Sequence, residues 1–177
     1  MPGYASERTA ALDSTRETAV LASRATKVGE ALTLRSQLQI RFQQLRERLK
    51  ASVLVQEDEK PPEDPEELLK ELESVADELE KLIARINKTN IATTLPNGGT
   101  LTDALARREY LALLQTAFHQ VAETASAGQA RYGKAEIRIL RTVDVGALRR
   151  RADDLAKERR ELDARIQEAN WQTELIA

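Results

Sequence analysis

Few residues of this 177-residue chain carry side chains that catalyse reactions or bind metal ions. The chain has no cysteine and a single histidine, His119, so it offers neither thiolate chemistry nor the clustered ligands of a zinc site. No serine or threonine has a recognisable base partner, and the Glu-x-x-His pairs of a di-iron bundle are missing from the sequence. We therefore expect a protein that is not an enzyme and that holds no metal or other cofactor.

A group of polar residues and the only tryptophan occurs where two predicted helices end. The group consists of Asn87, Thr89, Asn90, Asn170 and Trp171. Asn and Thr side chains satisfy the last backbone carbonyls of a helix and shape its exit turn, which is the simpler interpretation of this cluster. The alternative is a site for a small ligand or an anion. Trp171 is expected to cover an end of the core or an interface.

Four helices must position these side chains. Apolar residues recur at spacings of three and four, the period of one helix face. The predicted helices cover approximately residues 27–52, 64–90, 102–127 and 144–170. The sequence thus predicts a mainly α protein, an antiparallel four-helix arrangement of helical hairpins.

The second of these helices has the clearest sequence pattern. Asp64 is suited to cap its first amides, and Pro65 suits the first helical position. Its apolar residues step by four and three along a coiled-coil-like seam, formed by Leu68, Leu72, Val75, Leu79, Leu82 and Ile86. Asp144 is the corresponding cap of the last helix. We expect this seam to lie in the core or at an oligomer interface.

Two short segments predict a minor β element. The stretch TTLPNGGTL, residues 93–101, has Asn97, Gly98 and Gly99, which tolerate positive φ, and predicts a small hairpin or tight loop. The alternating stretch EIRILRTV, residues 136–143, fits a strand that pairs with residues 53–55.

Parts of the chain repeat. The stretch ARINKTNI from Ala84 returns as ARIQEANW from Ala164, and the apolar seam positions match at the same offset. One seam position changes from Leu79 to Arg159, which we expect to reach an acidic partner at a bundle edge or a subunit boundary. We predict a single duplicated helical domain over residues 28–177, with copies at about 28–95 and 100–177. Residues 1–27 form an N-terminal arm or extension.

Composition and charge limit the class of protein. Charged residues make up 32% of the chain, aromatic residues only 3%, and the net charge is −2. With no interleaved aromatic residues among the arginines, we expect no nucleic-acid partner. No apolar run reaches the length of a membrane span, and the expected compartment is the cytoplasm. An acidic segment at residues 57–80 beside basic helices predicts ion pairs within or between subunits.

Several stretches resemble those of a known family. They are GEALTLRSQLQIRFQQLRERL, VQEDEKPPEDPEELL, LIARINKTN, TLTDALARREYL, EIRILRTVDV and ARIQEANWQTEL. Over about residues 28–176 the chain resembles the septicolysin-like family of small bacterial helical proteins. The resemblance implies a helical protein that forms oligomers, and the family name suggests membrane activity. It carries over no catalytic residue.

The sequence therefore favours one function and leaves two alternatives. We expect a cytoplasmic, non-enzymatic helical protein that forms homo-oligomers and acts as a scaffold or protein-interaction module. The first alternative is a membrane-active, cytolysin-like oligomer. The second is binding of a small ligand or an anion at the Asn/Thr/Trp cluster.

Overall fold

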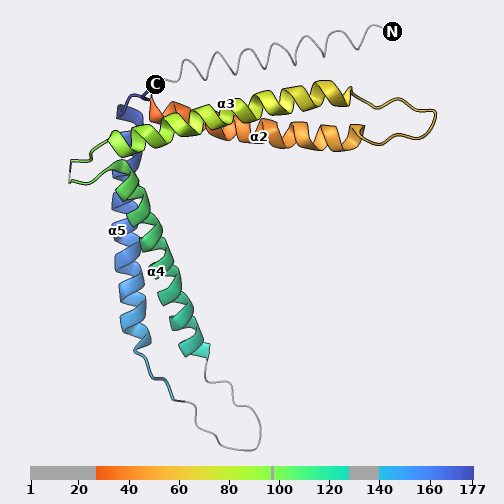
Figure 1. Cartoon of the computed structure of the whole chain (residues 1–177). Helices are drawn as coiled ribbons and strands as arrows, with labels where there is room; N and C mark the ends of the chain where they lie inside the picture. The colour runs from red at the N-terminus through yellow and green to blue at the C-terminus, as the bar shows by residue number, and fades with distance from the viewer. Residues whose placement is uncertain (1–26, 97, 128–139) are drawn as a thin grey trace, which may run out of the picture. The chain divides into compact units, whose positions relative to one another are not determined.

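The computed structural model describes residues 27–96, 98–127 and 140–177. It contains four described helices, which are α2 (Val28–Ser52), α3 (Pro65–Ala92), α4 (Leu101–Ala127) and α5 (Val145–Gln172) (Figure 1). The prediction of a mainly α protein made of four helices is confirmed. The predicted arm lies outside the described residues except for Lys27.

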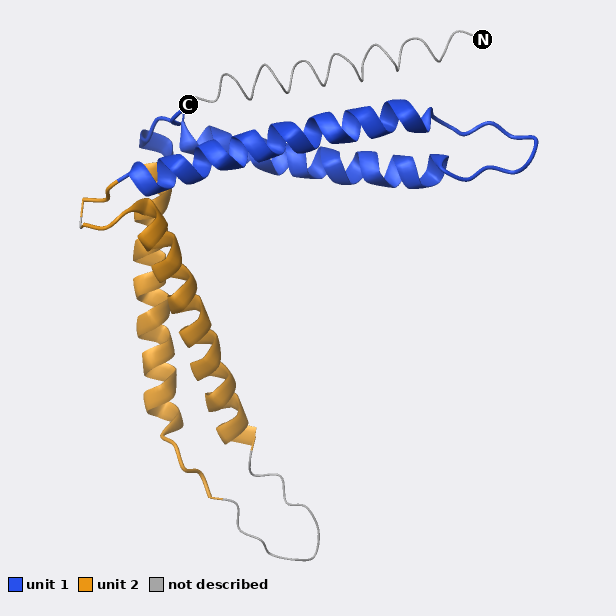
Figure 2. Ribbon diagram, viewed as in Figure 1, with its two compact units in different colours: residues 1–93, 170–177 blue, residues 94–169 orange. Residues whose placement is uncertain are grey.

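The chain divides into two compact units. Unit 1 comprises Met1–Thr93 and Asn170–Ala177, and unit 2 comprises Thr94–Ala169 (Figure 2). We expected one domain with two copies, and the unit boundary at residues 93–94 lies close to the boundary between those copies. The difference is at the C-terminus, because residues 170–177 belong to the same unit as α2 and α3.

Unit 1 is built around an antiparallel hairpin of α2 and α3. One face of each helix supplies its core, formed by Ala31, Leu34, Leu38, Leu45, Leu68, Val75, Leu82 and Ile86. Leu72 and Leu79 are partly buried against this core. All six residues of the predicted seam on α3 therefore contribute to packing within the hairpin.

Helices α3, α4 and α5 begin at side-chain caps. The Asp64 carboxylate accepts a hydrogen bond from the backbone N–H of Glu66 (2.9 Å), and the Asp144 carboxylate accepts one from the N–H of Ala147 (2.9 Å). At the start of α4, Thr100 and Asp103 cap each other, since each backbone N–H donates to the other side chain. These bonds satisfy amides that have no partner within the first turn of a helix.

Unit 2 pairs α4 with α5 around a smaller core. Its buried residues are Leu101, Ala104, Leu111, Leu162 and Ile166. Arg159, which stands where the repeat places Leu79, is partly buried, and its Nε meets no acceptor among the described residues. A charged side chain in the seam makes this helix pair less apolar than that of unit 1.

The predicted turn before α4 is present. The N–H of Leu95 donates to the carbonyl of Gly99 (3.0 Å), and the N–H of Gly98 donates back to the carbonyl of Leu95 (3.0 Å). Gly98 and Gly99 have φ values of 83° and 77°, a region that residues with a Cβ rarely adopt. An isolated bridge joins Thr94 to Thr100. The expected positive φ of Asn97 lies outside the described residues.

The strand predicted for residues 136–143 is absent from the part of it that the structure describes. Residues 136–139 lie outside the described part of the chain, but residues 140–143 and 53–55 form no strand. Leu54 is 86% exposed and Val53 and Val55 are exposed beside it, at the end of the unit 1 hairpin. Alternating apolar residues form a strand only where a partner strand and a core lie beside them.

Candidate functional site

Hydrogen bonds hold the C-terminal residues of the chain against the start of α2 and the last turns of α3. The backbone N–H of Val28 donates to the carbonyl of Thr173 (3.1 Å), and the ammonium of Lys27 donates to the carbonyl of Gln172 (3.0 Å). On α3, the Arg85 guanidinium donates to the carbonyl of Ile176 (3.2 Å). We call residues 172–176 and these partners the C-terminal clamp.

Thr89 is the buried centre of the clamp. Its hydroxyl donates to the carbonyl of Arg85 (2.8 Å) and accepts from the backbone N–H of Ile176 (3.0 Å). Both hydrogen-bonding functions of the hydroxyl are therefore used within the protein. This engagement supports the structural interpretation of the Asn/Thr/Trp cluster at Thr89.

The other members of the cluster do not converge on a ligand site. Asn87 is exposed, and Asn170 is partly buried. Asn90 is 9% exposed, and its side-chain oxygen has no donor within the described residues. Trp171 is 61% exposed although its ring lies against Gly29. The cluster thus contains one threonine that is bonded to the C-terminal residues, one buried amide and one exposed indole.

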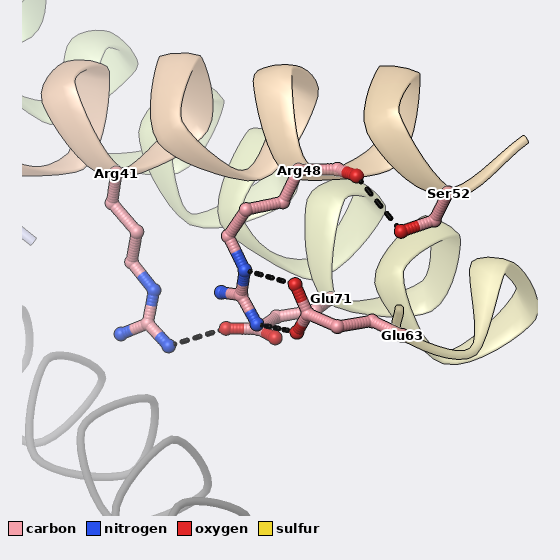
Figure 3. Close-up of polar contacts among 5 residues, drawn as sticks. All are labelled: Arg41, Arg48, Ser52, Glu63 and Glu71. Carbon is pink, nitrogen blue, oxygen red and sulfur yellow. Dashed lines mark hydrogen bonds and ion pairs between the residues drawn. The ribbon is translucent and has the colours of Figure 1, made fainter. Parts of the chain in front are cut away.

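Ion pairs join the basic side of α2 to the acidic side of α3 and the loop before it (Figure 3). A guanidinium nitrogen of Arg41 lies 2.6 Å from a carboxylate oxygen of Glu71. Only 15% of the Arg41 side chain and 20% of the Glu71 side chain are exposed. Arg48 binds the Glu63 carboxylate through two nitrogens, one of them Nε at 2.9 Å. The predicted complementarity between basic and acidic segments thus occurs within one hairpin.

Two carboxylates of unit 1 have shifted pKa values in opposite directions. The hydrogen bond from Arg48 lowers the pKa of Glu63, although partial burial opposes the shift. Partial burial raises the pKa of Glu78, whose Oε2 meets no donor among the described residues, and the charges of Arg41 and Lys81 oppose that rise. Since no described group of side chains around them could hold a metal ion, we assign to both carboxylates an effect on stability, favourable for Glu63 and unfavourable for Glu78.

Neither a metal site nor a sizeable cavity stands out in the described part of the chain. It contains no group of three or more His, Cys, Asp or Glu side chains able to hold a metal ion. A shallow pocket of about 210 Å³ lies in unit 2 beside the turn, lined by Leu95, Thr100, Arg107, Leu162 and Arg165 among others. Ligand pockets usually hold roughly 300 to 1,000 Å³. This pocket is too small and open to carry a ligand assignment.

A second apolar stripe runs along α4, on the side away from its buried face. It consists of Ala106, Tyr110, Leu113, Ala117 and Val121, all exposed. Ala106 and Leu113 each follow a buried residue by two positions, which is about 200° around a helix of 3.6 residues per turn. Leu113 is 64% exposed, Tyr110 47% and Val121 45%. We call these five residues the outer stripe.

Four of the five residues of the outer stripe, all but Ala106, lie in a charge-free part of α4. Residues 110–122, YLALLQTAFHQVA, contain no Asp, Glu, Lys or Arg, although such residues make up 32% of the chain. A helix that is apolar around most of its circumference is normally covered on more than one side. This run is visible in the sequence, but it was not among the features from which the fold and function were predicted.

His119 and the arginines of α5 do not form a reactive site. His119 is exposed on α4, two positions from both Ala117 and Val121, and therefore lies on a different side of the helix from the outer stripe. The Arg151 guanidinium lies 5.1 Å from the centre of the Phe118 ring, and Arg149 reaches the Ser126 hydroxyl at 3.4 Å. These contacts lie within unit 2.

No helix within the described ranges is both long and apolar enough to cross a membrane.

The comparisons with known proteins correct the resemblance stated above. A crystal structure of a functionally unknown conserved protein from Corynebacterium diphtheriae is 40% identical, with a TM-score of 0.80, covering 86% of this chain and 99% of that chain. No curated protein matches the chain. The septicolysin-like resemblance is wrong, since neither the structure nor the family model links the chain to septicolysins; the quoted stretches are mostly caps and amphipathic helices, which unrelated helical hairpins share. A family model described as "Family of unknown function (DUF6847)" matches residues 35–175, and the chain belongs to that family.

Proposed function

We propose that this protein is a non-enzymatic interaction module of the cytoplasm, a helical scaffold that assembles with copies of itself through the outer stripe of α4. The observation that carries this proposal is the exposure of Tyr110, Leu113 and Val121 along a single helix face. The absence of a reactive constellation from the sequence motivates the non-enzymatic part.

Burial of the outer stripe would release a substantial free energy. Covering a large apolar side chain is worth roughly 1.5 to 3 kcal/mol. The inner face of α4 is already used within unit 2 by Leu101, Ala104 and Leu111. The outer stripe is thus left for another partner, and its residues are spaced as in helix pairs that associate side by side.

A second copy of the chain is the partner that the stripe fits best. Identical stripes meet across a two-fold axis in a symmetric dimer, so each copy presents the surface that the other requires. A charged stripe would bring like charges together in such a pair. Residues 110–122 have no Asp, Glu, Lys or Arg, so this repulsion does not arise at the centre of the contact.

Sedimentation velocity over a range of micromolar concentrations tests the proposal. The unchanged chain should sediment as an oligomer of the 19.8 kDa subunit, and Leu113→Asp should sediment as a monomer. The matched control is Ile40→Asp, which places the same charge at an exposed aliphatic position of α2 and should leave the mass unchanged. Far-ultraviolet circular dichroism verifies that both variants remain helical.

Two results would overturn the assignment. A monomeric unchanged chain at every concentration would remove the self-association. If the oligomer persists in Leu113→Asp but is lost in Ile40→Asp, the contact between copies lies on α2 and not on α4.

A further inference from the structure

The unit 1 hairpin has an ion-paired side, which the contact between Arg41 and Glu71 defines (Figure 3). Arg41 of α2 follows the buried Leu38 by three positions, and Glu71 of α3 follows the buried Leu68 by three. Three positions turn about 300° around a helix, which places a residue about 60° to one side of the buried one. The ion pair therefore shows that these two flanks of α2 and α3 lie on the same side of the hairpin.

The opposite side of the hairpin is apolar. On α2, Phe42 follows Leu38 by four positions, and on α3, Leu69 follows Leu68 by one. These steps turn about 40° and about 100° in the other direction around the two helices. The residues at these positions, and at those that repeat them along each helix, are Phe42, Leu49, Leu69, Leu72, Ala76, Leu79 and Ile83. We call these seven residues the open side of unit 1, which Arg35 interrupts seven positions before Phe42.

The described part of unit 1 does not fully cover the open side. Leu69 is 44% exposed, and Phe42, Leu49, Leu72 and Leu79 are only partly buried against the core. Two packed helices bury the line of contact between them, whereas their flanks need a further neighbour. We therefore expect a third helix to lie along the open side, over both α2 and α3.

A row of glutamates borders the open side along α3. Glu66, Glu73 and Glu80 each stand three positions before one of its residues, which places them about 60° further out on the helix. All three are exposed, and their carboxylates form no hydrogen bond or ion pair with the described residues. The corresponding border on α2 carries Gln39 and Arg46 and is not acidic. A helix on the open side would therefore meet unpaired negative charge along one flank only.

We propose that the open side of unit 1 binds an amphipathic helix of another protein, with apolar residues on one face and Lys or Arg along one flank. Opposite charges at the border of an interface chiefly determine which partner is accepted. The outer stripe of a second copy fits this border poorly, because residues 110–122 contain no Lys or Arg. The inference goes beyond self-assembly through α4 and does not depend on it.

Two designed helical peptides of three heptads test this binding. Both carry leucine at the two apolar positions of each heptad, and their flanking positions are lysine in one peptide and glutamate in the other. Fluorescence anisotropy of each labelled peptide, titrated with the full chain, measures the affinity. The lysine peptide should bind at least roughly tenfold more tightly than the glutamate peptide. The difference should decrease as salt screens the charges.

Variants of the chain locate the charge and the apolar contact. Glu73→Lys combined with Glu80→Lys should abolish or reverse the preference for the lysine peptide. Glu57→Lys combined with Glu59→Lys makes the same change of charge in the loop before α3 and should preserve it. Leu69→Asp should weaken binding of the lysine peptide by roughly tenfold. Ile40→Asp, at an exposed position of α2 outside the open side, should not.

Three results would overturn the proposal. The first is equal affinity of the chain for the two peptides, or equal binding by Leu69→Asp and Ile40→Asp. The second is loss of peptide binding in Leu113→Asp, which would place the peptide on α4. The third is dissociation of an oligomer by Leu69→Asp in sedimentation velocity, which would assign the open side to a second copy. Normal peptide binding by Leu113→Asp is expected, and it separates this inference from assembly through α4.

Discussion

The hydroxyl of Thr89 accepts a hydrogen bond from the backbone N–H of Ile176, 87 positions later in the chain, over 3.0 Å. This bond fastens the C-terminal residues to α3 at a buried position. Together with the bond between Val28 and Thr173, it explains why residues 170–177 belong to unit 1 although most of α5 lies in unit 2.

Thr89→Val should destabilise the protein by about 1 to 2 kcal/mol, because the shape is kept while the N–H of Ile176 loses its acceptor. The free energy of unfolding from urea denaturation measures the loss. Thr33→Val is the matched control, because the Thr33 hydroxyl also donates to a carbonyl four residues earlier, that of Gly29, but takes no part in the hydrogen bonds of the C-terminal clamp. Equal losses in the two variants would contradict the clamp.

Leu72→Asp should cost several kcal/mol, since it places a charge where a leucine packs against the unit 1 core. Leu69→Asp, three positions earlier on the more exposed side of α3, should cost about 1 kcal/mol or less. Thermal and urea denaturation compare the two. Equal stability of Leu72→Asp and Leu69→Asp would show that Leu72 does not pack against the core of unit 1.

Much of α3 could be predicted from the sequence because several independent signals agree there. Asp64, Pro65 and the leucine spacing all indicate the same helix and the same face, and the structure buries Leu68, Val75, Leu82 and Ile86. The outer stripe of α4 was harder to recognise. Apolar residues occur on both sides of that helix, so periodicity alone does not separate a buried face from an uncovered one.

The hydrogen bond between α3 and the C-terminal residues also could not be predicted from the sequence. The residues of the Asn/Thr/Trp cluster lie towards the C-terminal ends of α3 and α5, but nothing in their spacing indicates that the Thr89 hydroxyl accepts a hydrogen bond from the backbone N–H of Ile176. The strand prediction was wrong in residues 140–143 because alternation in the sequence does not reveal whether a partner strand is available.

Glu63→Gln and Glu78→Gln should change stability in opposite directions. The pKa of Glu63 is lowered below its ordinary 4.5, so its stabilisation is present above that pH and is lost as the pH falls through the folded pKa. The pKa of Glu78 is raised above 4.5, so its ionisation reduces stability as the pH rises through that range.

At pH 7, Glu63→Gln should therefore destabilise the protein, by no more than about 0.5 kcal/mol because the pair with Arg48 is partly exposed and screened. Glu78→Gln should stabilise it. Denaturation at pH 7 and at pH 3 measures both, and the two differences should shrink at pH 3. Differences of the same sign at pH 7 would contradict the assigned causes.

Asn90→Leu should leave stability unchanged or raise it, because the substitution removes a buried amide oxygen that receives no hydrogen bond from the described residues. Thermal denaturation measures the effect, and Asn87→Leu at an exposed position is the control. A loss of more than about 1 kcal/mol confined to Asn90→Leu would show that the amide has a bound partner and would revive the ligand alternative.

Dipolar spectroscopy on a spin label at position 117 tests the pairing of the outer stripe most directly. The chain has no cysteine, so Ala117→Cys provides a unique attachment site on the stripe, and Asp153→Cys on the exposed side of α5 provides a control. Facing helices pack with axes about 8 to 10 Å apart, so labels at position 117 of two copies should lie within about 20 Å. A separation of that size at position 117, with a longer one at position 153, is the predicted result. The absence of any dipolar coupling between labels at position 117, at concentrations where the unchanged chain is fully folded, would contradict assembly through α4.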